Sequence, residues 1–128
     1  MTHETPLAHA VSGGVRILLR LEGLALFAAS LALYARVSGD WLLLLALFPV
    51  PDASFAFYLF GPRMGAAAYD AAHTTPGALA LAAAGVAAPS QPALAAALVW
   101  LAHIGLDRAL GFGLKYASGF RHTHLGHL

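Results

Sequence analysis

The chain has 128 residues, of which 59 % are hydrophobic and 10 % are charged, whereas an average soluble domain is about 25 % charged. This composition is typical of a membrane protein, and it excludes a nucleic-acid-binding protein, because the net charge is only +1 and the basic residues are scattered singly. Cysteine is absent, so disulfides and thiolate metal sites are excluded, and any metal must be bound by His, Asp or Glu.

Four apolar segments follow one another along the chain, and a helix needs about 20 such residues to cross the hydrocarbon core of a bilayer. We expect spans at about residues 15–37, 41–60, 64–87 and 93–115, followed by a His-containing tail over 116–128. The turns between them are short, so neighbouring spans should be antiparallel. The sequence therefore predicts an all-α fold, an integral membrane four-helix antiparallel bundle that forms one domain over residues 1–128.

The basic residues near the span ends predict the orientation, because Lys and Arg are enriched in cytoplasmic loops. One side of the expected topology carries Arg16, Arg20, Arg63, Lys115 and Arg121, whereas the other side carries Arg36. We therefore expect a multi-pass protein of a cell inner membrane with both termini in the cytoplasm.

Two prolines interrupt the second span. Pro49 and Pro51 come just ahead of Asp52, and proline removes a backbone donor and clashes with the preceding turn. The helix should break there and restart with Pro51 in its first turn, which places Asp52 at a helix amino terminus inside the membrane. Such a break is tolerated where it is buried in protein or lines a wet cavity. The alternative is an ordinary proline kink with Asp52 as a helix cap.

Ionisable residues in the later spans are spaced so that they share helix faces. His103 and Asp107 are four residues apart, and Asp70 and His73 are three apart, so each pair lies on one face of a helix. In the antiparallel topology they lie at a depth similar to that of Asp52, in the cytoplasmic half of the bundle. Ionisable groups inside a span indicate function by default, so these pairs are a candidate ligand set for a divalent cation. The alternative is that they only bond neighbouring helices together.

The remaining polar residues are expected to pair between helices or to lie in the tail. Arg20, Glu22 and Arg108 should pair between helices, because unpaired charges inside a span are expensive. The tail histidines His122 and His124 point the same way in an extended chain, and a loop could fold them under the bundle to complete a metal site. The alternative for the two histidines is a solvated tail.

Five elements together resemble one known family. They are RLEG at 20–23, PD at 51–52, YD and the following H at 69–73, WLAHIGLDRALGFGLKY at 100–116 and FRHTHLGH at 120–127. On these elements the chain resembles a small family of bacterial multi-pass membrane proteins known only as a domain of unknown function. The resemblance covers essentially the whole chain and implies a helical membrane protein of about four spans. It implies no activity, substrate or cofactor.

A weaker likeness concerns chemistry rather than kinship. Zinc-dependent membrane hydrolases of the ceramidase and progestin-receptor kind combine Ser, Asp and several His within helices, but they have about seven spans. The same residue types occur here as Ser54, Asp52, His73, His103, Asp107, His122 and His124.

The leading hypothesis is a metal-dependent membrane hydrolase that acts on a lipid or another amphiphile from the cytoplasmic leaflet. Zinc or iron would be bound by His73, His103 and one or both of His122 and His124, Asp107 would orient a ligand or bind directly, and Asp52 would be the general base. One alternative is a proton-coupled carrier or small-molecule-binding protein, which would need to form an oligomer because four short spans enclose little space. A further alternative is a structural membrane protein without catalysis.

Overall fold

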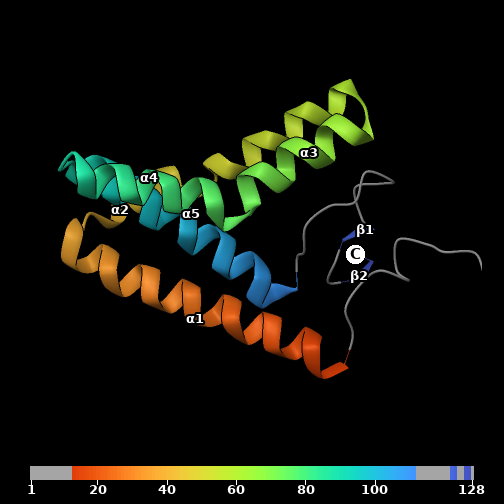
Figure 1. The fold of residues 1–128 in the computed structure, drawn as a ribbon, viewed down its shortest axis with the longest axis horizontal. Helices are drawn as coiled ribbons and strands as arrows, with labels where there is room; N and C mark the ends of the chain where they lie inside the picture. The colour runs from red at the N-terminus through yellow and green to blue at the C-terminus, as the bar shows by residue number, and fades with distance from the viewer. Residues whose placement is uncertain (1–12, 112–121, 124–125, 128) are drawn as a thin grey trace, which may run out of the picture.

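The computed structural model describes residues 13–111, 122–123 and 126–127 of the chain (Figure 1). Its helical elements are α1 (Gly13–Val37), α2 (Trp41–Leu47), the 3₁₀ helix η2 (Val50–Phe60), α3 (Pro62–His73), α4 (Thr75–Ala87) and α5 (Gln91–Leu110). Two short strands, β1 (His122–Thr123) and β2 (Gly126–His127), pair antiparallel with His122 opposite His127. The described part of the chain is therefore almost wholly helical, as the composition predicts.

Among the described residues, three segments are long and apolar enough to cross a membrane: α1, the α2 and η2 pair over Trp41–Phe60, and α5. The helix α4 is apolar but shorter. Half of the apolar window of α5 is buried within the protein, against 17 % for α1 and 6 % for the α2 and η2 pair. Consequently α5 is the central helix, and the other two candidate spans expose most of their apolar surface, as membrane helices do.

Helix packing is organised around α5. The helices α1 and α4 each pack along α5, while η2 packs along α3. One buried cluster lies between α1 and α5 and contains Tyr34, Leu98 and Val99, and a second lies between α4 and α5 and contains Ala78 and Ile104. The core of the protein is therefore two helix interfaces that share α5.

The α1 and α5 helices approach most closely at two glycines. A Cβ at Gly23 would overlap the Cβ of Arg108, and a Cβ at Gly105 would lie 2.6 Å from the backbone nitrogen of Phe27. Small residues allow such close backbone contact between apolar helices, where van der Waals packing and not the hydrophobic effect drives association. The two glycines of the RLEG and HIG sequences therefore fix the register of α5 against α1.

The predicted break of the second span is confirmed. The helix α2 ends at Leu47, and η2 begins at Val50 with a proline in its first turn. The amide of Asp52 donates to the carbonyl oxygen of Pro49 at 2.9 Å, which closes the first turn of η2. Asp52 therefore lies at the amino end of a restarted helix, as expected from the two prolines that precede it.

The segment 64–87, expected as a single span, is divided into α3 and α4 by Thr74, whose backbone is extended at φ −107° and ψ 156°. Pro76 accounts for this difference, because it lacks an N–H and its ring would clash with the carbonyl of Ala72 in a continuous helix. The 12 residues of α3 are about 18 Å long at 1.5 Å per residue, which is too short to cross a hydrocarbon core of about 30 Å. The helices α3 and α4 can cross it only together.

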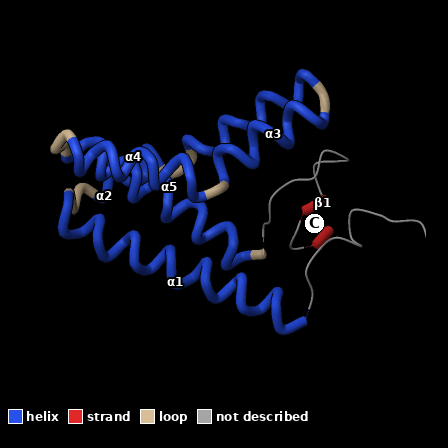
Figure 2. Tube along the Cα trace, in the orientation of Figure 1, coloured by secondary structure: helices blue, strands red, loops and turns tan. Residues whose placement is uncertain are grey.

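Figure 1 shows that the chain reverses direction at each turn along the long axis of the molecule. The start of α1, the turn at Gly61 and the end of α5 lie toward one end, and the turns at 38–40 and 88–90 lie toward the other. Figure 2 shows that the loops of the described part of the chain are short connections at these turns, at the helix breaks and at the end of α5. The η2 and α3 pair diverges from the direction of α4, so that the two breaks lie near the middle of the molecule.

Candidate metal centre

Four ionisable side chains meet where the two helix breaks face α5. Asp52 comes from the first turn of η2, His73 is the last residue of α3, and His103 and Asp107 lie one turn apart on α5. One ligand atom from each residue lies within 4.8 Å of those of the other three, so the group could hold a metal ion. The structure thus brings together Asp52, His73, His103 and Asp107, which are separated by up to 55 positions in the sequence.

The four side chains make a closely spaced set of contacts. The Nε2 atoms of His73 and His103 are 3.2 Å apart. Each of these nitrogens lies 3.2 Å from Oδ1 of Asp52. Oδ2 of Asp107 is 3.5 Å from Nε2 of His73 and 3.2 Å from Nε2 of His103. Two imidazole nitrogens and two carboxylate oxygens therefore surround one point.

The hydrogen bond that each imidazole makes through Nδ1, the ring nitrogen that faces away from the cluster, fixes its tautomer. Nδ1 of His73 is 2.9 Å from the carbonyl oxygen of Tyr69, and Nδ1 of His103 is 2.6 Å from that of Phe48. A carbonyl oxygen can only accept a hydrogen bond, so each Nδ1 carries the proton and donates it. In a neutral histidine this leaves a lone pair on Nε2, and both lone pairs face the cluster. Metal-binding histidines usually have this arrangement, with the second ring N–H donated to a carbonyl or carboxylate.

With both histidines neutral, the cluster is therefore composed of acceptors. Each Nε2 atom lies 3.2 to 3.5 Å from the other Nε2 and from both carboxylate oxygens, and all four atoms lie within 4.8 Å of one another. These acceptors repel unless a positive charge lies between them. A divalent cation would neutralise the two carboxylates, and buried charges persist in proteins only when paired or bound to metal. Ligand atoms of a tetrahedral zinc site with bonds of about 2.0–2.2 Å are roughly 3.3–3.6 Å apart. The observed spacings are close to that geometry.

The four donors differ in exposure. His73 and His103 are both 2 % exposed, whereas the side chains of Asp107 and Asp52 are 20 % and 46 % exposed. His103 also contacts the ring of Phe48, with the ring centroids 4.9 Å apart. The imidazoles are therefore held rigidly in the interior, and Asp52 lies on the accessible side of the cluster.

A row of residues along η2 aligns Asp52 with His73. Side chains three apart eclipse one another in a 3₁₀ helix, so Asp52, Phe55 and Tyr58 share one face. This face packs on α3, where the ring of Phe55 is 5.2 Å from that of Tyr69, and Tyr69 stacks on His73 at 3.8 Å. At the far end of the row, a Cβ at Gly65 would overlap the ring of Tyr58. The glycine therefore lets the two helices come close enough for Asp52 to reach His73.

Two side chains of α5 bind the carboxyl end of α3. The indole nitrogen Nε1 of Trp100 donates to the carbonyl oxygen of Ala72 at 2.5 Å, and the guanidinium of Arg108 donates to that of His73 at 2.8 Å. The last carbonyls of a helix have no partner within it, and the helix break leaves these two without amide donors from α4. The residues Trp100 and Arg108 thus fasten the helix end that carries His73 to the helix that carries His103.

The remaining predicted residues lie elsewhere or outside the described residues. Asp70 is not a member of the four-residue cluster. His122 lies in β1, where the structure describes its backbone pairing only, and His124 lies outside the described residues. Arg20, Glu22 and Arg108 were expected to pair between helices. Arg20 of α1 donates to the carbonyl oxygen of Ala109 on α5 at 3.0 Å, and Arg108 of α5 donates to that of His73 on α3, so both arginines contact another helix through a backbone carbonyl.

Sequence reasoning missed the parts of the site made by the backbone and by Trp100. The carbonyl oxygens of Phe48 and Tyr69 leave no signal in side-chain patterns, and Trp100 was not among the predicted site residues. Pro76 did carry a usable signal, because a proline four residues after Ala72 predicts that the carbonyl of Ala72 needs another donor.

These observations define the class: a helical protein whose described residues include three helices that could span a membrane and a group of two buried histidines and two partly exposed aspartates that could hold a metal ion. The chain belongs to the family described as Domain of unknown function (DUF4260), whose sequence model matches residues 16–128. No curated protein and no solved structure matches the chain significantly. The expectation of an uncharacterised family is thereby confirmed.

Proposed function

We propose that the chain is an integral protein of the inner membrane of a bacterial cell that crosses it four times as an antiparallel bundle, with both termini in the cytoplasm. The crossings are α1, the α2 and η2 pair, the α3 and α4 pair, and α5. Support comes from the alternating chain direction in Figure 1 and from the apolar surfaces of these helices. Basic residues near the start of α1, at Arg63 and in the tail favour this orientation.

The proposed function is that of a metal-dependent hydrolase whose substrate is a lipid or another amphiphile. One observation carries the metal site: four acceptor atoms lie within 4.8 Å of one another while each imidazole is anchored through Nδ1. Zinc suits such a mixed nitrogen and oxygen ligand set, and iron is bound by two histidines and one carboxylate in many enzymes. A bound divalent cation supplies a Lewis acid that activates water for hydrolysis.

The exposure of the four side chains suggests how their roles are divided. Catalytic zinc sites have three protein ligands and one position for water or substrate. The buried His73 and His103 together with Asp107 are the proposed ligands, and the more exposed Asp52 is the proposed general base that takes a proton from the attacking water. Because His73, His103 and Asp107 already supply three ligands, His122 and His124 are not required as ligands.

A second candidate function is supported by the same contacts. The atoms of Asp52, His73, His103 and Asp107 form an unbroken series with spacings of 3.2 to 3.5 Å, and such a series inside a membrane can relay protons in a carrier. In that case a shared proton, and not a metal ion, would lie between the two Nε2 atoms.

Hydrolysis by purified protein tests the proposed function. We expect fluorogenic esters and amides with acyl chains to be cleaved by zinc- or iron-loaded protein in mixed micelles, and cleavage to stop when a chelator removes the metal. Asp52→Asn should lose cleavage while retaining metal. Asp70→Asn is the matched control, because it makes the same substitution at an aspartate outside the cluster. Loaded protein that cleaves none of these substrates, or an Asp52→Asn variant with wild-type rates, would contradict the proposal.

A further inference from the structure

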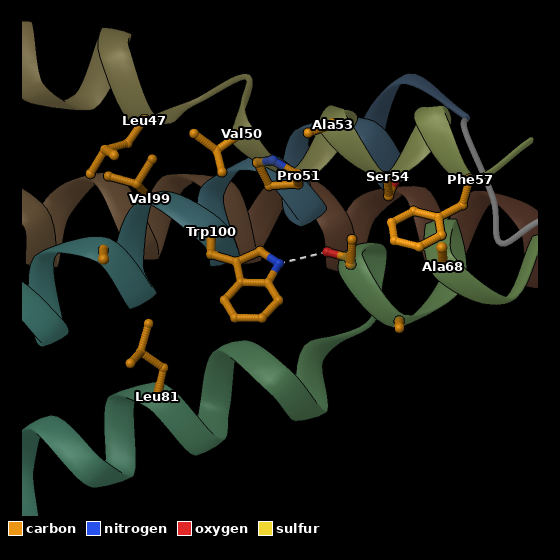
Figure 3. A pocket seen from close by; sticks show the side chains of 13 residues that line it. Leu47, Val50, Pro51, Ala53, Ser54, Phe57, Ala68, Leu81, Val99 and Trp100 are labelled. Atoms are coloured by element: carbon orange, nitrogen blue, oxygen red, sulfur yellow. Dashed lines mark hydrogen bonds between the residues drawn. The ribbon is translucent and has the colours of Figure 1, made fainter. Parts of the chain in front are cut away.

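An apolar pocket of about 580 Å³ lies between η2, α3, α4 and α5 (Figure 3). Its walls include Val50, Ser54 and Phe57 from η2, Leu81 from α4, and Trp100 from α5. Alanines of α3 and α5 form much of the rest, so the pocket exists because small side chains occupy these positions. Its volume is within the range of about 300–1,000 Å³ that is typical of small-molecule sites in proteins.

The chemistry of the lining restricts what can occupy the pocket. All of its side chains are hydrocarbon except those of Ser54 and Trp100. The indole N–H of Trp100 is already donated to the carbonyl of Ala72, as Figure 3 shows. A buried water needs two to four polar partners, so a single serine hydroxyl cannot hold ordered water or a polar ligand there. The lining is complementary to a hydrocarbon chain.

The walls of the pocket are continuous with the metal centre. Pro51 and Ala53 line the pocket on either side of Asp52, and Ala72 lines it directly before His73. Val99 lines it four residues before His103, and residues four apart lie on the same face of a helix with their Cβ atoms about 5–6 Å apart. The pocket therefore adjoins the side chains of the proposed metal centre along η2, α3 and α5.

The outer edge of the pocket is open to the surroundings of the protein. Val50 and Phe57 are 56 % and 46 % exposed, and both lie on η2, which belongs to a candidate membrane span. In a bilayer these residues face lipid, so a hydrocarbon chain can enter from the membrane without crossing water.

We propose that this pocket binds one acyl chain of the lipid or amphiphile whose polar part is hydrolysed at the metal centre. This inference rests on the proposed function, because it identifies the part of the same substrate that the protein binds outside the metal centre. The pocket selects a linear hydrocarbon chain, and its walls place the polar end of that chain beside Asp52.

A photoactivatable phosphatidylcholine with a diazirine on one acyl chain tests the inference in vesicles of unlabelled phosphatidylcholine that contain the full chain. After illumination, mass spectrometry locates the labelled residues. We expect labelling to concentrate on pocket residues of η2, α3 and α5, severalfold above the exposed lipid-facing residues of α1. In the double variant Ala68→Leu and Ala96→Leu, which fills the pocket, labelling of these residues should fall severalfold.

Ala32→Leu is the matched control, because it makes the same change at an exposed position of α1, and it should leave pocket labelling unchanged. Labelling that is even over all exposed apolar faces would overturn the inference, and so would labelling that the double variant does not alter. If a second copy of the chain covers the pocket, the pocket residues are likewise not labelled above the other apolar faces, and the inference is overturned. The same labelling is measured on protein treated with a chelator. If the pocket is labelled but the protein binds no metal, acyl-chain binding in the pocket is supported and the proposed metal-dependent function is refuted. If the protein binds metal but the pocket is not labelled, acyl-chain binding is refuted and the proposed metal site stands.

Discussion

The hydrogen bond from Trp100 to α3 permits a sharp test of how the site is held. Trp100→Phe keeps an aromatic ring but removes the N–H that donates to the carbonyl oxygen of Ala72 at 2.5 Å. In an unbroken helix this carbonyl would accept from residue 76, but Pro76 has no N–H. The carbonyl therefore loses its donor, and α3 loses one of the two bonds that fasten its carboxyl end, and His73 with it, to α5.

The size of the effect follows from these contacts. Leaving a fully buried carbonyl without a donor costs about 1–3 kcal/mol, and the carbonyl of Ala72 is partly buried, so this range is an upper limit. Changes to the groups that orient metal ligands weaken metal affinity by about 10–100-fold, which corresponds to about 1.4–2.7 kcal/mol. Since the two ranges overlap, we expect the dissociation constant for zinc to rise about 10- to 100-fold in Trp100→Phe.

A competition titration measures this change directly. Metal-free protein in detergent is titrated with zinc in the presence of a chromophoric chelator, and the wild type is compared with Trp100→Phe and with Trp41→Phe. Trp41 is the matched control, because it begins α2, is half exposed and packs on Tyr34 and not on the site. Equal affinities for wild type and Trp100→Phe, or equal losses in both variants, would show that Trp100 does not position His73.

Three further predictions concern packing, protonation and topology. Gly105→Ala should destabilise the protein by roughly 1–3 kcal/mol, as other overpacking changes do, because the new Cβ would lie 2.6 Å from the backbone nitrogen of Phe27. Thermal unfolding of this variant is compared with that of Gly14→Ala, whose new Cβ would have no neighbouring atom within 4 Å. Zinc affinity should decrease as the pH is lowered from neutral, because imidazoles and carboxylates bind metal only when deprotonated, and an affinity that is constant with pH would contradict the ligand set. A reporter active only in the cytoplasm should be active when fused to the carboxyl terminus, whereas activity of a periplasmic reporter there would reverse the orientation.

The sequence predicted the parts of the site that depend on local spacing. The four-residue interval between His103 and Asp107 sets their common helix face whatever the rest of the fold does. The prolines before Asp52 dictate a helix break because of covalent geometry alone. The similar depth of His73 followed from counting residues between turns, but its contact with His103 could only be located to within a turn or two of helix.

Other parts of the fold depend on contacts between distant segments. The break at Thr74 lies in an Ala-rich run, and the high helix propensity of that run favoured one helix over the break that Pro76 signals. The break is tolerated because Trp100 and Arg108 approach the exposed carbonyls from α5, which no local pattern reveals. The 3₁₀ geometry of η2 likewise depends on packing against α3, although the three-residue spacing of Asp52, Phe55 and Tyr58 is visible in the sequence.

The metal content of purified protein tests the central claim most directly. Protein prepared without a chelator is analysed for transition metals as wild type, as His103→Ala and as Asp70→Asn, which alters a carboxylate outside the cluster. We expect about one zinc or iron ion per chain in the wild type, as for a single mononuclear centre, the same amount in Asp70→Asn and severalfold less in His103→Ala. A metal-free wild type that also fails to bind added zinc or iron, or equal metal in wild type and His103→Ala, would contradict a metal centre at these four side chains.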